Sequence, residues 1–240
     1  MTAPTFWSAT RRGASHEKSG TPNQDSCLGI HFTWGDFLAL SDGVGSNSES
    51  HVGSRMACRA AADAANTCLR HSGADFELIL PLLHDLWRVY LGAAPPESAH
   101  ATCRFAFTWR ENLHIASLGD GMTAVCGKSP EDTLIFEEDK QDSFVNVTDS
   151  LGPVSDISLW RTATLPLKDW HGVLLCSDGL SEDYRPETRP RLAWSIFKNF
   201  ASMAPPRRRR ELKKILSRGA PGHHDDKTII ALCWRPYDGN

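Results

Sequence analysis

The sequence predicts an α+β protein in which helices cover antiparallel β-sheets. Short apolar segments follow one another through the second half of the chain, a pattern typical of antiparallel strands. Two longer segments, within residues 54–70 and 76–92, carry apolar residues at helical spacing. Helices placed between early and late strands indicate a sheet with a covered face. With 240 residues and 40% hydrophobic side chains, the chain can bury a full core.

The first expected elements are a hairpin and two helices. Residues 27–32 and 36–41 flank a short turn and form the hairpin, and residues 54–70 form an alanine-rich helix. In residues 76–92, Pro81 either kinks a helix or lies in its first turn, where proline is tolerated. The strands expected elsewhere are residues 102–109, 113–120, 122–127, 132–136, 159–165, 172–178 and 228–234.

The charge balance and the apolar runs exclude some function classes. A net charge of −3 and a pI near 6.4 lack the basic character of a dedicated nucleic-acid binder. The first residues have no apolar core of signal-peptide length, and the longest apolar runs are far too short to cross a membrane. We therefore expect a cytoplasmic protein with no nucleic-acid partner and no membrane partner.

A Ser-Asp-Gly triplet ends two of the apolar segments, in FLALSDG at 37–43 and in VLLCSDG at 173–179. Asp-Gly after a strand is commonly a hairpin turn, but no second strand follows at once at either place. Each buried strand is therefore expected to present a carboxylate at its tip, Asp42 or Asp178. The glycine after it allows the backbone to approach another group closely.

Further aspartates occupy similar places, namely Asp25 in PNQDS, Asp120 in LGDG and the pair Asp225-Asp226 before the last strand. Aspartates that fold together cannot all stay charged unless a positive group lies among them. Mg²⁺ and Mn²⁺ are the usual partners of ligand sets made only of oxygen. Two such ions would activate a water for attack on phosphorus.

In this order, the triplet Asn-Gln-Asp, then SDGVG, Gly-Asp-Gly, SDGL and Asp-Asp-Lys-Thr resemble the motif series of the metal-dependent type 2C (PPM) Ser/Thr protein phosphatases. The reading Gly-x-x-His followed by Gln-Asp is similar to a bacterial-like branch of the family. The resemblance covers nearly the whole chain and implies one domain over residues 1–240. It also implies a four-layer α-β-β-α sandwich and a signalling hydrolase that removes phosphate from Ser or Thr of a protein phosphorylated by a kinase.

The resemblance implies a ligand set for two tightly bound Mg²⁺ or Mn²⁺ ions and a third, weaker ion. Asp42 would bridge the two ions, Asp25 would act through metal-bound water, and Asp120 with Asp178 would serve the third ion. The implied metal ligands are Asp25, Asp42, Gly43 through its carbonyl, Asp120, Asp178 and Asp225. Within the acidic pair, Asp225 is assigned because the family pattern reads Asp, usually Asn, any residue, then Thr.

Two positions depart from the family pattern. Gln24 stands where Glu is frequent, and an amide can still orient a metal-bound water. His16 stands where many bacterial members place an arginine that holds substrate phosphate, so we assign His16 as the phosphate-side catalytic residue. Arg11 or Arg12 could supply the missing charge, and Arg12 is the candidate phosphate-binding arginine.

Two function classes remain open at this stage. One is an active phosphomonoesterase, and the other is a catalytically weakened relative that works by binding. The sequence favours activity because every implied direct ligand is still Asp or Gly. A phosphatase with a phosphorylated aspartate would need Asp-x-Asp after its first strand, which LSDGVG lacks. Residues 184–220 could form a flap or insert, and Arg207 to Arg210 indicate a polar helix face or a local docking patch.

Overall fold

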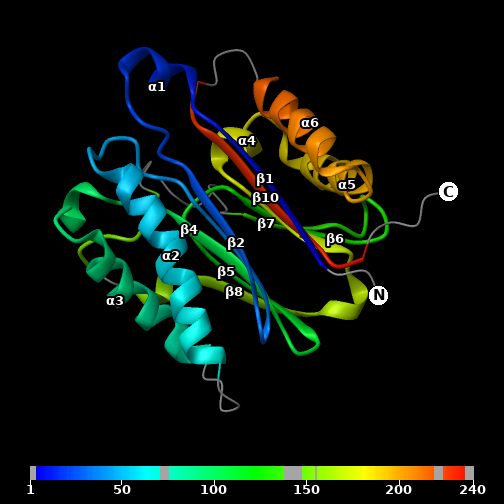
Figure 1. The fold of residues 1–240 in the computed structure, drawn as a ribbon, viewed down its shortest axis with the longest axis horizontal. Helices are drawn as coiled ribbons and strands as arrows, with labels where there is room; N and C mark the ends of the chain where they lie inside the picture. Colours follow the sequence, from blue (N-terminus) through cyan, green and yellow to red (C-terminus); the bar gives the residue numbers. More distant parts are fainter. Residues whose placement is uncertain (1–3, 71–75, 138–147, 155, 219–223, 236–240) are drawn as a thin grey trace.

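The computed structural model describes residues 4–70, 76–137, 148–154, 156–218 and 224–235. Its strands form two five-stranded antiparallel sheets that pack face to face (Figure 1). The first sheet has the order β1-β10-β9-β6-β7, and the second has the order β2-β3-β4-β5-β8. The strands are β1 (Thr5–Arg11), β2 (Ser26–Phe32), β3 (Gly35–Ser41), β4 (Cys103–Trp109), β5 (Asn112–Leu118), β6 (Met122–Cys126), β7 (Leu134–Glu137), β8 (Arg161–Pro166), β9 (Gly172–Cys176) and β10 (Lys227–Cys233).

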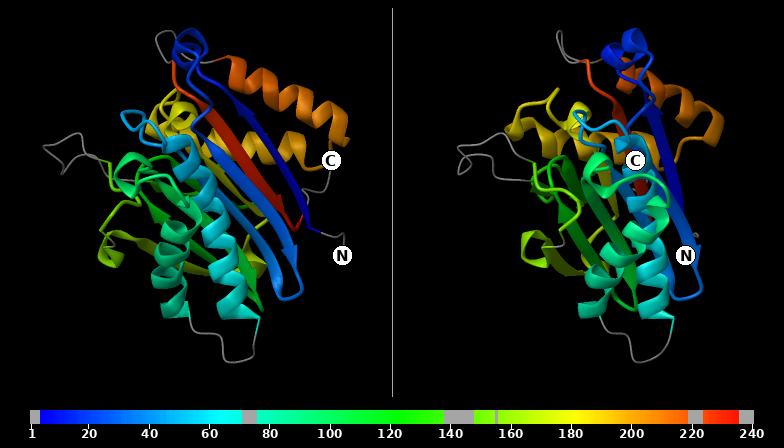
Figure 2. Two further views of the ribbon diagram at one scale, coloured as in Figure 1. Left: turned by 60° about the vertical axis from the view of Figure 1, so that its left-hand side comes forward. Right: turned by 90° about the vertical axis from the view of Figure 1, so that its left-hand side faces the viewer.

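Helices cover the outer face of each sheet. Helices α2 and α3 pack on the second sheet, and α5 and α6 pack on the first, as the two views of Figure 2 show. This arrangement confirms the predicted four-layer α-β-β-α sandwich. The helices are α1 (Ala14–Ser19), α2 (Ser50–Leu69), α3 (Ile79–Leu91), α4 (Asp178–Ser181), α5 (Arg189–Phe200) and α6 (Pro205–Ser217), with short 3₁₀ turns η1 (Phe76–Leu78), η2 (Pro96–Ser98), η4 (Ile157–Leu159), η5 (Leu167–Asp169) and η6 (Pro186–Thr188).

The central strands are buried on both faces, which explains their unbroken apolar sequences. In β3, Leu38 and Leu40 point between the sheets, whereas Phe37 and Ala39 point toward the helices on the outside. Side chains alternate along a strand, so both faces of β3 need apolar residues. From the opposite sheet, Val173 of β9 belongs to the same central core. One core therefore joins the two sheets.

The helices show where Pro81 lies and which elements the structure places in residues 184–218. Pro81 lies in the first turn of α3, after η1, so it begins a helix and does not kink one. The described part of residues 184–220, which ends at residue 218, contains α5 and α6, and Phe197 and Leu212 are among the side chains that they bury against the first sheet. These two helices form the outer helical layer on the first sheet.

Over the part of the chain that the structure describes, no helix is long and apolar enough to cross a bilayer.

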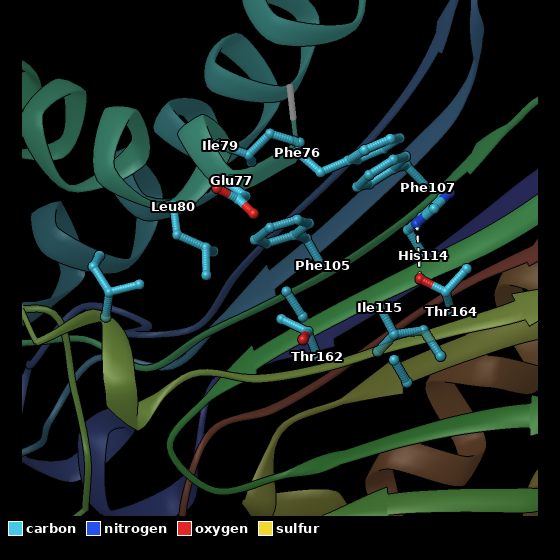
Figure 3. A pocket seen from close by; sticks show the side chains of 13 residues that line it. Phe76, Glu77, Ile79, Leu80, Phe105, Phe107, His114, Ile115, Thr162 and Thr164 are labelled. Atoms are coloured by element: carbon cyan, nitrogen blue, oxygen red, sulfur yellow. Dashed lines mark hydrogen bonds between the residues drawn. The ribbon is translucent and has the colours of Figure 1, made fainter. Parts of the chain in front are cut away.

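A pocket of about 450 Å³ opens between η1, α3 and the outer face of β4, β5 and β8 (Figure 3). The rings of Phe76, Phe107 and His114 stack on one another along its wall. Phe105 and Leu80 form another part of the lining. None of the aspartates that the sequence singled out lines this pocket. The predicted chemistry therefore lies elsewhere, at the strand ends.

Candidate metal centre

The predicted carboxylates come from the ends of strands in both sheets. Asp42 directly follows β3 of the second sheet, and Asp178 begins α4 two residues after the end of β9 in the first sheet. Asp25 precedes β2, Asp120 lies in the turn between β5 and β6, and Asp225 lies two residues before β10. Their charges act on one another: Asp25, Asp178 and Asp225 each raise the pKa of Asp42. The predicted residues therefore meet at one end of the sandwich.

Burial makes this cluster electrostatically unfavourable on its own. Removal from water, with the nearby charges of Asp226 and Asp178, raises the pKa of Asp25 to about 7. Burial and the charge of Asp120 raise the pKa of Asp178 to about 6. Burial, followed by the neighbouring carboxylates, raises the pKa of Asp42 well above its ordinary value. A cation placed among these oxygens would reverse these shifts.

Two oxygen atoms in the cluster have no partner within the described part of the chain. They are Oδ1 of Asp25 and Oδ1 of Asp178, and both are buried. The other oxygen of Asp25 accepts a hydrogen bond from Ser177 Oγ at 2.8 Å. Buried polar atoms without partners are rare in folded proteins and need an explanation. Oxygen-only donors with orphaned atoms fit a hard divalent cation such as Mg²⁺ or Mn²⁺.

Main-chain hydrogen bonds fix Asp42 and Gly43. The Asp42 N–H donates to Thr102 Oγ1 at 3.0 Å, and the Thr102 N–H donates to the Asp42 carbonyl at 2.8 Å. The Gly43 N–H donates to the Gln24 carbonyl at 3.1 Å. A Cβ atom at Gly43 would lie 2.7 Å from the Ser50 carbonyl oxygen, so only glycine fits without displacement. Thr102 was not found by sequence reasoning, because nothing in its local pattern marks its contact with Asp42.

The two members of the acidic pair have different environments. Asp225 is exposed, and its charge raises the pKa of both Asp42 and Asp178. Asp226 is 1% exposed and accepts hydrogen bonds from the N–H groups of Gly13 and Gln24, each at 2.6 Å. Asp226 therefore holds the loops of Gly13 and Gln24 in place beside the site. Sequence reasoning missed this role. Its two donors lie more than 200 positions away in the chain.

His16 in α1 lies beside the acidic pair. Its Nδ1 is 3.0 Å from Asp226 Oδ2, and one ligand atom from each of His16, Asp225 and Asp226 lies within 4.8 Å of the others. Arg12 is exposed, and its guanidinium donates to the Thr21 carbonyl at 3.4 Å. Arg12 also lines a pocket of about 130 Å³ together with Asp225. Both predicted phosphate-side residues therefore lie at the rim of the carboxylate cluster.

A buried arginine holds the turn that carries Asp120. Gly119 and Gly121 on either side have φ angles of 84° and 95°, which favour glycine. Arg104, 1% exposed, donates to the Gly119 carbonyl at 3.3 Å and also to the Asp120 carbonyl. The Asp120 carboxylate accepts from Thr148 Oγ1 at 3.1 Å. Sequence reasoning missed Arg104 because it lies within an apolar strand segment.

Comparison with known proteins identifies related sequences and folds. The family described as "Protein phosphatase 2C" matches residues 12–217. A bacterial serine phosphatase structure has a TM-score of 0.66 and 16% identity, and the similarity covers 98% of this chain and 99% of that one. Serine/threonine phosphatase Stp1 from Staphylococcus aureus has a TM-score of 0.69 and 16% identity, and the similarity covers 99% of this chain and 96% of that one. The catalytic domain of the serine/threonine protein phosphatase PstP was solved in complex with 2 manganese ions. It has a TM-score of 0.63 and 18% identity, and the similarity covers 96% of this chain and 97% of that one.

None of the curated proteins compared with the chain matches it. At 16–18% identity, the structural similarity establishes the fold and nothing more about the site.

Proposed function

Because the chain belongs to the protein phosphatase 2C family, we propose that it is a Mg²⁺- or Mn²⁺-dependent phosphomonoesterase acting on phospho-Ser or phospho-Thr of proteins. The observation that carries this proposal is the cluster of the buried Asp25 with the half-buried Asp42 and Asp178, which have raised pKa values and two buried oxygens without a partner. PstP, which has the same fold, was solved with 2 manganese ions, and this supports a dinuclear site here. A Ser/Thr kinase would supply the phosphorylated substrate.

The proposed ligands are those that the resemblance of the motifs implies. Asp42, Asp178, Asp225 and the Gly43 carbonyl would hold two ions as direct ligands. Asp25 would act through water, and Asp120 with Asp178 would hold a third, weaker ion. When bound, the ions would lower the pKa of the attacking water and neutralise charge on the phosphoryl group. The hydrogen bonds of the Asp42 and Gly43 main chain would keep these two ligands in place.

Phosphate binding is assigned to His16 and Arg12. The Asp226 carboxylate faces Nδ1 of His16, which leaves Nε2 as the nitrogen available to a substrate. Arg12 would add a charge-assisted hydrogen bond from the same rim. Asp226 is not assigned to phosphate binding, because an ionised carboxylate offers no hydrogen-bond donor and its negative charge repels the phosphate.

The test is turnover of p-nitrophenyl phosphate and of a phosphothreonine peptide with Mn²⁺, with Mg²⁺ and with chelator. We expect Asp42→Asn and Asp178→Asn each to lower turnover by about 100-fold or more, because each removes a charged ligand. The matched control is Asp169→Asn on the exposed η5 turn, which should behave like the parent. Activity within a few-fold of the parent in either ligand variant would contradict the ligand assignment.

The alternative is a phosphatase-like binding module with weakened catalysis. Isothermal titration calorimetry with Mn²⁺ separates the two possibilities, because it measures metal binding without turnover. Tight binding of two ions by a parent protein that hydrolyses neither substrate would favour the binding module. Metal binding together with chelator-sensitive turnover would favour the enzyme.

A further inference from the structure

Helix α6 presents an unusually basic outer face. Of the chain's 26 Lys and Arg residues, six lie exposed on α6 or directly after it, whereas this stretch holds one of the 29 Asp and Glu residues, Glu211. The six exposed basic residues are Arg207, Arg209, Arg210, Lys213, Lys214 and Arg218. The helix lies in the outer layer of the sandwich, on the side of the first sheet (Figure 1).

These six residues take no part in packing the helix on the sheet. Arg208 alone of the four consecutive arginines faces inward, where it stacks 4.9 Å from the Trp7 ring centroid. Leu212 and Leu216 complete the buried side of the helix. The fold therefore explains Arg208 but not its exposed neighbours.

The exposed charges also oppose the stability of the helix. Arg207 lies in the first turn, which has no acidic residue, although the positive end of the helix dipole disfavours a cation there. Arg209 and Lys213 are like charges four residues apart, and so are Arg210 and Lys214. Residues that break local rules without a structural gain commonly serve function.

The ion pairs on this helix leave much of its charge uncompensated. Glu211 accepts from Lys214 at 2.9 Å and lies 3.4 Å from Arg210. Within the described residues, no ion pair is seen for Arg207, Arg209 or Lys213. These three side chains are therefore available to an external anion.

The C-terminal end of α6 lies beside Asp225, at the rim of the candidate metal centre. Leu216 and Ser217 line the same 130 Å³ pocket as Arg12 and the proposed ligand Asp225. A protein whose phosphorylated residue lies at the carboxylates can therefore continue along α6. From Arg207 to Arg218 the helix spans about 17 Å, the length of roughly five extended residues.

We propose that the exposed face of α6 is a docking surface for an acidic segment of the phosphoprotein substrate. This inference rests on the proposed function and names a feature of its substrate. The short span and the charge of the face match a segment of a few Asp or Glu residues. A long polyanion would extend past α6 onto a surface where acidic residues outnumber basic ones, since the chain has a net charge of −3.

The test compares two phosphothreonine peptides, one carrying six glutamates and the other six glutamines beside the phosphorylated residue. The parent should show a lower KM for the glutamate peptide, by roughly three- to tenfold at low salt, because several exposed ion pairs add their small effects. The preference should shrink at about 0.15 M salt. The variant Arg207→Gln, Arg209→Gln, Lys213→Gln should lose the preference and keep the parent turnover of p-nitrophenyl phosphate.

A matched control removes three exposed basic residues outside α6, as Arg70→Gln, Lys128→Gln, Lys168→Gln. This control lowers the net charge by the same amount as the α6 variant, and it should retain the preference for the glutamate peptide. Thermal unfolding gives a second readout: the α6 variant should melt no lower than the parent, since it loses the like-charge pair of Arg209 and Lys213 and the cation of the first turn. Retention of the preference by the α6 variant, or equal loss by the control, would overturn the proposal.

Direct binding separates this proposal from the proposed function. Fluorescence polarisation of a labelled, unphosphorylated six-glutamate peptide requires no catalysis and should show weaker binding to the α6 variant. Absence of phosphatase activity with α6-dependent peptide binding would overturn the enzyme assignment and keep the docking surface. Tighter α6-dependent binding of phosphatidylserine vesicles or of a single-stranded oligonucleotide than of the peptide would overturn the docking proposal.

Discussion

Replacement of Asp25 by asparagine should stabilise the chelated protein at neutral pH and above. Asp25 is 9% exposed, and its pKa rises from 3.8 to about 7 in the fold, chiefly through burial. The folded protein thus holds a proton that the unfolded chain has lost between these two pH values. Stability therefore falls as pH rises through this window and levels off above about pH 7. A shift of about three pKa units corresponds to a loss on the order of 4 kcal/mol.

An amide side chain at this position does not ionise, so Asp25→Asn should escape this loss. For a chain of this size, 1 kcal/mol changes Tm by about 2–4 °C, which gives a difference on the order of 10 °C. The assay is thermal unfolding in EDTA, followed by circular dichroism from about pH 4.5 to pH 8. The difference in Tm between variant and parent should increase with pH across this range.

Asp169→Asn on the exposed η5 turn is the matched control and should follow the parent at every pH. Saturating Mn²⁺ should remove the advantage of Asp25→Asn at pH 8, because the ion stabilises the ionised carboxylates of the parent. A difference in Tm that is constant from about pH 4.5 to pH 8 would refute the argument. So would a chelated parent that gains stability relative to the variant as pH rises.

Two further substitutions test the turn between β5 and β6. Asp120→Ala should lower turnover several-fold and leave two tight Mn²⁺ sites, counted by calorimetry; loss of all tight binding would contradict its assignment to a third ion. Arg104→Met should destabilise the protein by roughly 3 kcal/mol in urea unfolding, because it leaves the buried Gly119 carbonyl and the half-buried Asp120 carbonyl without their donor. Arg104→Lys should recover part of this stability, and equal stability of parent and Arg104→Met would show that the contacts contribute little.

Much of the fold was predictable because its central strands are buried on both faces. The apolar runs that end at Asp42 and Asp178 correspond to β3 and β9, and the match to the phosphatase 2C family confirms the resemblance of the motifs. Strand β1 was not predicted, although Trp7 and Ala9 alternate with more exposed neighbours. Two buried residues at alternate positions are a weak signal next to a terminus.

The sequence predicted the aspartates of the candidate site, but it did not predict the contacts that hold them in place. Each aspartate that follows a strand could be found locally, because Asp-Gly after an apolar run is visible in a short window. The roles of Asp226 and Arg104 depend on tertiary contacts: Asp226 meets Gly13 at a separation of 213 positions. An arginine in a strand would be expected to be exposed, whereas Arg104 is buried once both sheets have formed. No local periodicity encodes such contacts.

The position of the cluster between the sheets links its chemistry to the stability of the fold. Asp42 belongs to the second sheet, whereas Asp178 and Asp225 belong to the first, so an ion held by all three would connect the two sheets. Without that ion, the buried carboxylates repel one another and lower the stability of the end of the sandwich that they share. The same burial that destabilises them raises their affinity for a divalent cation, because binding relieves the repulsion. Metal affinity and the pH-dependent loss of stability therefore have one physical origin, and Asp25→Asn should weaken both together.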